Sequence, residues 1–154
     1  MSAKLYQIKL TVNGLPETYE VPANELLIDT LRERGAYTSV KRGCDDGECG
    51  ACTVIMNDKA VPSCEVLTVE ADGAEILTLE GLGGEELHPI QQAFIDNGAI
   101  QCGFCTPGMV LTTKALLDEN PHPTDEEITE AIQNNICRCT GYVSILRAIH
   151  SLIR

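Results

Sequence analysis

The sequence feature that most constrains the fold of this 154-residue chain is its eight cysteines, which fall into two groups of four. The first group is Cys44-x4-Cys49-x2-Cys52, followed by Cys64, which is the spacing of plant-type 2Fe–2S sites. Three glycines in the same segment let the backbone turn tightly and bring its N–H groups close to sulfur. The segment therefore predicts a 2Fe–2S site.

The second group consists of Cys102-x2-Cys105 and Cys137-x-Cys139. Four cysteines in this pattern also suit a structural zinc ion, although the Cys-x-Cys pair is closer than in most zinc sites. Disulfides are less favoured, because the N-terminal segment lacks the apolar stretch of an export signal. We therefore predict a second iron–sulfur site and keep zinc as the alternative.

The first half of the chain has the pattern of a small sheet with one helix. Apolar residues alternate from Tyr6 to Val12, and Asn13-Gly14 is a strong signal for a hairpin turn. The expected elements are strands over 6–12, 15–21, 53–56, 59–61 and 75–79, and a helix over 25–34 that Asn24 caps. The strands over 53–56 and 59–61 are expected to form a second hairpin across Asn57-Asp58.

The second half has the pattern of four short amphipathic helices. Pro89 and Pro107 occupy first-turn positions, Thr124 with Glu127 forms a capping box, and His88 lies where a capping role suffices. We predict an α+β chain whose parts are a sheet domain at 1–80, a glycine-rich linker at 81–85 and a helical domain at 86–154.

The net charge of the chain limits the classes of partner that it can bind. A formal net charge of −12 disfavours nucleic acids and anionic membrane surfaces, and no apolar run approaches the length of a membrane span. We expect no membrane insertion and a cytoplasmic location, with export or membrane association only through partners. The acidity suits solubility and steering toward a basic partner protein.

Three segments resemble one known family over nearly the whole chain. The segments 43–54, 101–108 and 135–142 are similar to motifs of the small iron–sulfur subunits of the molybdenum hydroxylases, which include xanthine dehydrogenase and aldehyde oxidoreductase. The resemblance implies an N-terminal β-grasp domain, like that of plant-type ferredoxins, followed by a C-terminal four-helix bundle domain. It also implies that each group of four cysteines holds one 2Fe–2S cluster.

The resemblance further implies partners and cofactors outside this chain. A large subunit would hold molybdopterin, of the cytosine dinucleotide type, and a medium subunit would hold FAD. By resemblance, Gln101 and Cys139 contact the pterin. No catalytic residue is expected here, because the substrate would be transformed on the large subunit.

The expected function is therefore electron transfer within an oxidoreductase complex, between a molybdopterin site and FAD or another acceptor. A free-standing two-cluster carrier of the ferredoxin type is the rival interpretation. Similar small subunits serve purines, aldehydes, carbon monoxide, N-heterocycles and aromatic CoA esters, so the substrate is not encoded in this chain.

Overall fold

The first half of the chain forms a five-stranded sheet with the strand order β2-β1-β5-β3-β4. The computed structural model describes residues 4–153. Two antiparallel hairpins flank the central strand, which runs parallel to β1 and antiparallel to β3. The strands are β1 Leu5–Val12, β2 Leu15–Pro22, β3 Thr53–Met56, β4 Lys59–Pro62 and β5 Glu75–Leu77.

Both hairpins turn through two residues with positive φ. The values are 52° at Asn13 and 78° at Gly14 in the first turn, and 48° at Asn57 and 67° at Asp58 in the second. Two successive left-handed residues match the right-handed twist of the flanking strands, and Asn, Asp and Gly adopt this conformation most easily. The predicted hairpins are therefore present, and the turn residues explain both registers.

Helix α1 begins at Leu27 and is not capped by Asn24, so that part of the prediction was wrong. The N-cap is Leu26, which makes no side-chain capping bond. The Glu25 carboxylate instead accepts two hydrogen bonds of 2.7 Å from Arg34 at the far end of the helix. The helix comprises α1 Leu27–Asp29 and a π-helical continuation over Thr30–Arg34.

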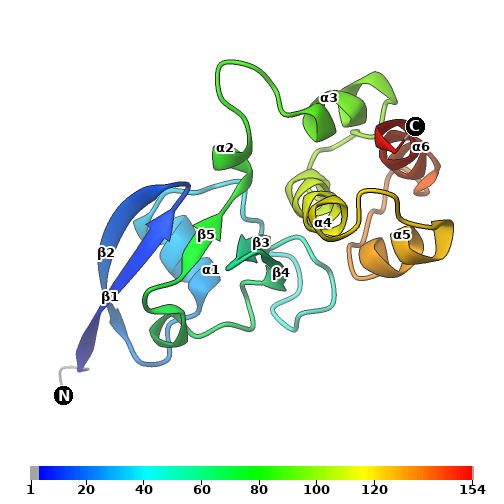
Figure 1. The fold of residues 1–154 in the computed structure, drawn as a ribbon. Coiled ribbons are helices and arrows are strands. Elements are labelled where there is room, and N and C mark those ends of the chain that lie inside the picture. Colours follow the sequence, from blue (N-terminus) through cyan, green and yellow to red (C-terminus); the bar gives the residue numbers. More distant parts are fainter. Residues whose placement is uncertain (1–3, 154) are drawn as a thin grey trace.

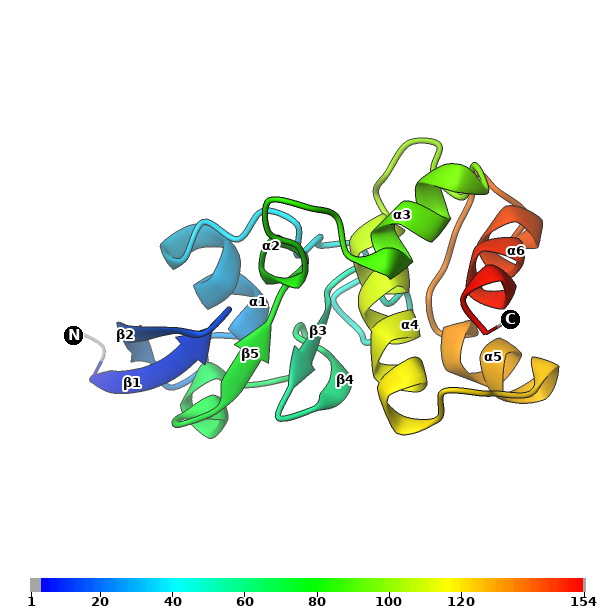
Figure 2. The ribbon, with the colours of Figure 1, turned by 45° about the horizontal axis from the view of Figure 1, so that its top comes forward.

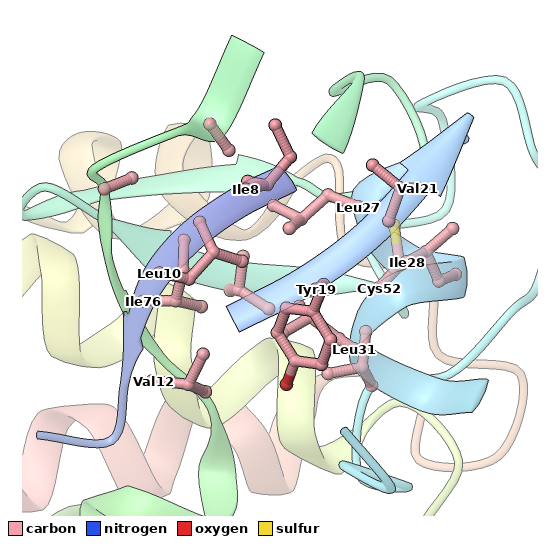
Figure 3. Packing of buried hydrophobic residues seen from close by; sticks show 14 of the residues in the cluster. Ile8, Leu10, Val12, Tyr19, Val21, Leu27, Ile28, Leu31, Cys52 and Ile76 are labelled. Atoms are coloured by element: carbon pink, nitrogen blue, oxygen red, sulfur yellow. The ribbon is translucent and has the colours of Figure 1, made fainter. Parts of the chain in front are cut away.

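A hydrophobic core fills the space between this helix and the sheet (Figure 3). Val12 and Val21 of the first hairpin and Leu27, Ile28 and Leu31 of the helix are fully buried there. Burying such a side chain contributes about 1.5–3 kcal/mol. This first core holds the helix on the sheet. It thereby fixes the position from which the chain continues after the C-terminal end of the helix.

The second half is helical, and a short helix connects it to the sheet. The predicted capping box of α5 is present, since Thr124 Oγ1 accepts from the Glu127 N–H and the Glu127 carboxylate accepts from the Thr124 N–H. No helix within residues 4–153 is long and apolar enough to cross a membrane. The remaining elements are a 3-10 turn at Thr68–Ala71, α2 Leu79–Leu82, α3 Pro89–Asp96, α4 Thr106–Glu119, α5 Asp125–Ile132 and α6 Val143–Leu152.

Helix α4 lies between the sheet and the other long helices (Figures 1 and 2). Its buried residues Met109 and Val110 belong to a second core, together with residues of α3, α5 and α6. Strand β3 joins the two cores, because Val54 belongs to the first and Ile55 to the second. The two halves of the chain therefore pack directly against each other.

Candidate metal centres

The first four cysteines gather where the chain passes from α1 to the hairpin of β3 and β4. Cys44 and Cys49 are half-buried in the first cysteine loop (residues 43–52), while Cys52 and Cys64 are buried. The pairing of β3 with β4 brings Cys64 beside Cys52, whose carbonyl accepts from the Ser63 hydroxyl at 2.7 Å. One loop and one hairpin thus supply the whole predicted set.

Glycines give the first cysteine loop its shape. Gly47 and Gly50 have φ of 76° and 64°, a conformation that side chains rarely adopt. A Cβ atom on Gly43 would lie 2.6 Å from the Cys49 sulfur, so any other residue at this position would displace that thiol. The Cys49 N–H also donates to the Cys44 sulfur at 3.4 Å. Backbone N–H groups directed at sulfur are what a negatively charged iron–sulfur site requires.

Burial is the main influence on the acidity of two of these thiols. It raises the pKa of Cys64 to about 12, with a further contribution from the hydrogen bond to Cys52. Burial likewise raises the pKa of Cys49. Both groups therefore carry protons at neutral pH, and a metal ion that bound there would have to displace those protons.

The second four cysteines gather at one end of the helical half. Cys102 and Cys105 lie at the start of α4, where Cys105 is the N-cap residue. Cys137 and Cys139 lie between α5 and α6, in the second cysteine loop (residues 135–142). The Cys139 thiol donates to the Cys102 sulfur at 3.6 Å, and both side chains are exposed, whereas Cys137 is buried.

Local hydrogen bonds offset burial in this second group. Burial would raise the pKa of Cys137, but the Thr140 hydroxyl at 3.0 Å and the Thr140 N–H at 3.4 Å donate to its sulfur and hold the pKa below its usual value. The Phe104 N–H and the Cys139 thiol lower the pKa of Cys102. Burial raises the pKa of Cys105 to about 12.

The eight predicted ligands are therefore brought together in two groups, one in each half of the fold. None of the eight cysteines is paired in a disulfide. Within residues 4–153, no three or more His, Cys, Asp or Glu side chains converge on a single metal ion, whereas a 2Fe–2S cluster divides its four cysteines between two irons. Gln101, the other predicted site residue, is exposed and directly precedes the exposed Cys102.

A buried polar contact between the two cysteine loops was missed by the sequence analysis. The Asn135 side chain, only 3% exposed, donates to the Gly50 carbonyl at 3.0 Å and accepts from the Thr112 hydroxyl at 2.9 Å. The only sequence signal was that Asn135 belongs to the cysteine motif at 135–142. Nothing in the sequence shows that its partner is 85 residues away.

Two family models match the chain, and together they span both groups of cysteines. The model described as "2Fe-2S iron-sulfur cluster binding domain" matches residues 10–78. The model described as "[2Fe-2S] binding domain" matches residues 78–150. These matches decide against the zinc alternative and support two 2Fe–2S clusters on this chain.

Two curated relatives match this chain over nine tenths of its length. The nicotinate dehydrogenase small FeS subunit of Eubacterium barkeri is 54% identical over 144 residues, which cover 92% of this chain and 91% of the relative. The xanthine dehydrogenase iron-sulfur-binding subunit of Escherichia coli O157:H7 is 46% identical over 92% of this chain and 91% of the relative. The chain belongs to the small iron–sulfur subunits of the molybdenum hydroxylases. The resemblance seen in the sequence motifs is thus confirmed.

Solved structures agree with this membership. A chain of quinoline 2-oxidoreductase from Pseudomonas putida 86 superimposes with a TM-score of 0.92 at 43% identity, covering 96% of this chain and 91% of that chain. In aldehyde oxidoreductase from Desulfovibrio gigas, with a TM-score of 0.91, the same fold covers only 17% of a longer polypeptide. This iron–sulfur subunit is therefore an electron-transfer part of a larger oxidoreductase, and the substrate is transformed on another chain. The free-standing carrier is not favoured.

Proposed function

We propose that Cys44, Cys49, Cys52 and Cys64 hold one 2Fe–2S cluster, and that Cys102, Cys105, Cys137 and Cys139 hold the other. The observation that carries this proposal is the gathering of the eight thiols into two groups whose loops direct N–H groups at sulfur. Each bound cluster would accept and release one electron at a time. The chain itself tunes this exchange through burial and through N–H and hydroxyl groups near sulfur.

The different roles that we propose for the two halves follow from which cysteines are exposed to solvent. Cys102 and Cys139 are exposed, and the nearby residues Gln101 and Phe104 are exposed as well. We propose that this face meets a large subunit that carries molybdopterin, of the cytosine dinucleotide type, with Gln101 and Cys139 contacting the pterin. The cluster of the first cysteine loop would then exchange electrons with FAD on a medium subunit or with another acceptor.

The layout of the chain supports the same assignment. We propose a β-grasp domain of the plant-type ferredoxin kind at 1–80, a linker at 81–85 and a four-helix domain at 86–154. The sheet order and the helix that covers the sheet support the first domain, and α3 to α6 support the second. Residues 1–3 and 154, the outermost of both domains, lie outside the described part. We propose a cytoplasmic location for the chain, because cysteines that bind iron and are not paired in disulfides are typical of a reducing compartment.

Iron analysis and electron paramagnetic resonance of the reduced protein test the ligand assignment. We expect about four iron atoms per chain and two distinct signals in the unmodified protein. Cys64→Ser is expected to remove one signal and about half of the iron, and Cys137→Ser is expected to remove the other signal. One atom of zinc per group, or loss of the same signal in both variants, would overturn the assignment.

A separate experiment tests the pterin contacts. In the assembled complex, Gln101→Ala is expected to lower substrate turnover while the iron content stays the same, because the lost amide no longer orients the pterin. Gln133→Ala is the matched control, since Gln133 is an exposed glutamine at the end of α5. Equal turnover and equal pterin content in both variants would show that Gln101 has no such role.

A further inference from the structure

The two cysteine loops are joined by a pair of hydrogen bonds between neighbouring residues. The Ile136 N–H donates to the Cys49 carbonyl at 2.9 Å, and the Asn135 side-chain amide donates to the Gly50 carbonyl at 3.0 Å. Cys49 is a proposed ligand of one cluster, and Ile136 directly precedes Cys137, a proposed ligand of the other. The contact therefore lies between the two sites and not at the edge of either.

The Asn135 side chain uses both ends of its amide in this contact. Its nitrogen donates to Gly50, and its oxygen accepts from the hydroxyl of Thr112 on α4 at 2.9 Å. The residue is 3% exposed, so neither bond is replaced by water without cost. An amide held at both ends in a buried place has a single orientation. Asn135 thus links the first cysteine loop to α4 and to the second cysteine loop.

The atoms around these hydrogen bonds are closely packed. A Cβ atom on Gly108, in the first turn of α4, would lie 2.2 Å from the Gly50 carbonyl oxygen and 3.0 Å from the Asn135 amide nitrogen. The backbone of α4 therefore touches the first cysteine loop directly. The distance between the two loops is fixed by contact, and Asn135 supplies the directional bond within that contact.

We propose that Asn135 is a positioning residue that sets the separation of the two clusters and thereby the rate of electron transfer between them. This inference rests on the proposed ligand assignment. In each transfer one electron leaves the reduced site and enters the oxidised site, with no bond made or broken. The transfer rate falls steeply with separation, and the hydrogen bonds from Asn135 and Ile136 hold the first cysteine loop at a set distance from the second. Loss of one such bond would let the separation vary.

The decisive variant is Asn135→Asp in the assembled, iron-loaded complex. Aspartate has almost the same shape and still accepts from Thr112, but at a pH high enough to ionise it, where the measurements are made, its carboxylate repels the Gly50 carbonyl instead of donating to it. Asn134→Asp is the matched control, since it adds the same charge at the neighbouring, exposed position. Thr112→Val is a milder second variant, which keeps the bond to Gly50 and removes the bond that orients the amide.

Three measurements are made on each variant. With both sites reduced, electron paramagnetic resonance reports the magnetic coupling between them, which falls with the cube of their separation. Rapid kinetics after photoreduction gives the rate of electron transfer between the sites, and hydrogen exchange reports opening of residues 44–52 and 135–138. For Asn135→Asp we expect weaker coupling, slower transfer and about tenfold faster exchange, because a buried carbonyl loses its partner. Thr112→Val is expected to change the coupling in the same direction by less, and Asn134→Asp to leave it unchanged.

The possible outcomes distinguish a failure of this inference from a failure of the proposed ligand assignment. A role in stability alone would shift the unfolding midpoint without changing the magnetic coupling. Unchanged coupling and transfer rate in Asn135→Asp would overturn the inference, while two signals and about four iron atoms in the unmodified protein would leave the ligand assignment intact. If Asn135→Asp fails to retain both clusters, Thr112→Val decides. Weakened coupling in that variant supports the inference, and unchanged coupling overturns it.

Discussion

Tyr142 shows how single residues shape the second metal site. Its backbone is left-handed, with φ of 67°, which is rare for an aromatic residue and has to be stabilised by its surroundings. The phenol oxygen accepts from the Cys137 N–H at 2.9 Å and donates to the Asn135 carbonyl at 3.2 Å. One side chain therefore holds both Asn135, two residues before the second cysteine pair, and Cys137, the first cysteine of that pair.

Replacing Tyr142 by phenylalanine tests this holding role. The ring remains, but the Cys137 N–H loses its acceptor, and we expect the free energy of unfolding to fall by about 1 kcal/mol. Urea unfolding of the iron-loaded chain, followed by circular dichroism, gives the value. Tyr6→Phe is the control, because Tyr6 is 37% exposed and the change should cost under about 0.5 kcal/mol. Equal stability of the two variants would refute the role.

At the scale of elements, helix ends depend on local hydrogen bonds that also respond to pH. His88 caps α3 through Nδ1, which accepts from the Ile90 N–H at 3.3 Å, while the Gln91 side chain accepts from the His88 N–H at 2.9 Å. Burial lowers the pKa of His88 below the usual 6.5; the charge of Lys114 lowers it further, and Asp118 opposes the shift. The folded state therefore favours the neutral imidazole, the only form in which Nδ1 accepts a bond.

The sign of the pH effect follows from this lowered pKa. The cap contributes its full stabilisation above pH 6.5 and loses it as the pH falls through the lowered pKa of the folded state. His88→Asn keeps a capping acceptor that does not titrate, so its urea midpoint should fall less than that of the unmodified protein upon acidification. His122→Asn serves as the control, because His122 is exposed. A pH dependence that is the same in both variants would exclude the cap as its source.

At the scale of the whole molecule, β3 links the stability of the two halves. Its residues are buried in succession and do not alternate, because α1 covers one face of this part of the sheet and α4 covers the other. Val54 packs in the first core, and Ile55 packs in the second core although it belongs to the sheet. A substitution in β3 is therefore expected to destabilise one half of the chain or the other, depending on the face of the sheet on which the side chain lies.

Two neighbouring substitutions test this arrangement. Ile55→Ala is expected to cost about 2–5 kcal/mol and to speed hydrogen exchange mainly in α4. Val54→Ala removes two fully buried methyl groups from the opposite face and should affect α1 and the first hairpin more. Hydrogen exchange resolved by peptide gives the comparison. The same exchange pattern in both variants would show that the two cores do not respond separately.

The sequence by itself determined the local features of this protein. The cysteine spacing indicated the 2Fe–2S sites, the Asn-Gly and Asn-Asp pairs placed the hairpins, and Pro89, Thr124 and Glu127 marked the helix starts. Each depends on the conformational preference of a few adjacent residues, which a sequence displays directly. The Asn24 cap failed for a tertiary reason, since Leu26 forms an antiparallel bridge with Leu67, which keeps the chain extended there, and the helix begins only at Leu27.

Only the tertiary structure decided how the two halves meet. The Asn135 bond to Gly50, the passage of α4 over the first cysteine loop and the double burial of β3 all join segments far apart in the chain. Such contacts depend on the summed packing of two cores, and no short pattern encodes them. The sequence thus determines which residues can hold iron, and the packing of the two halves determines how far apart the two sites lie.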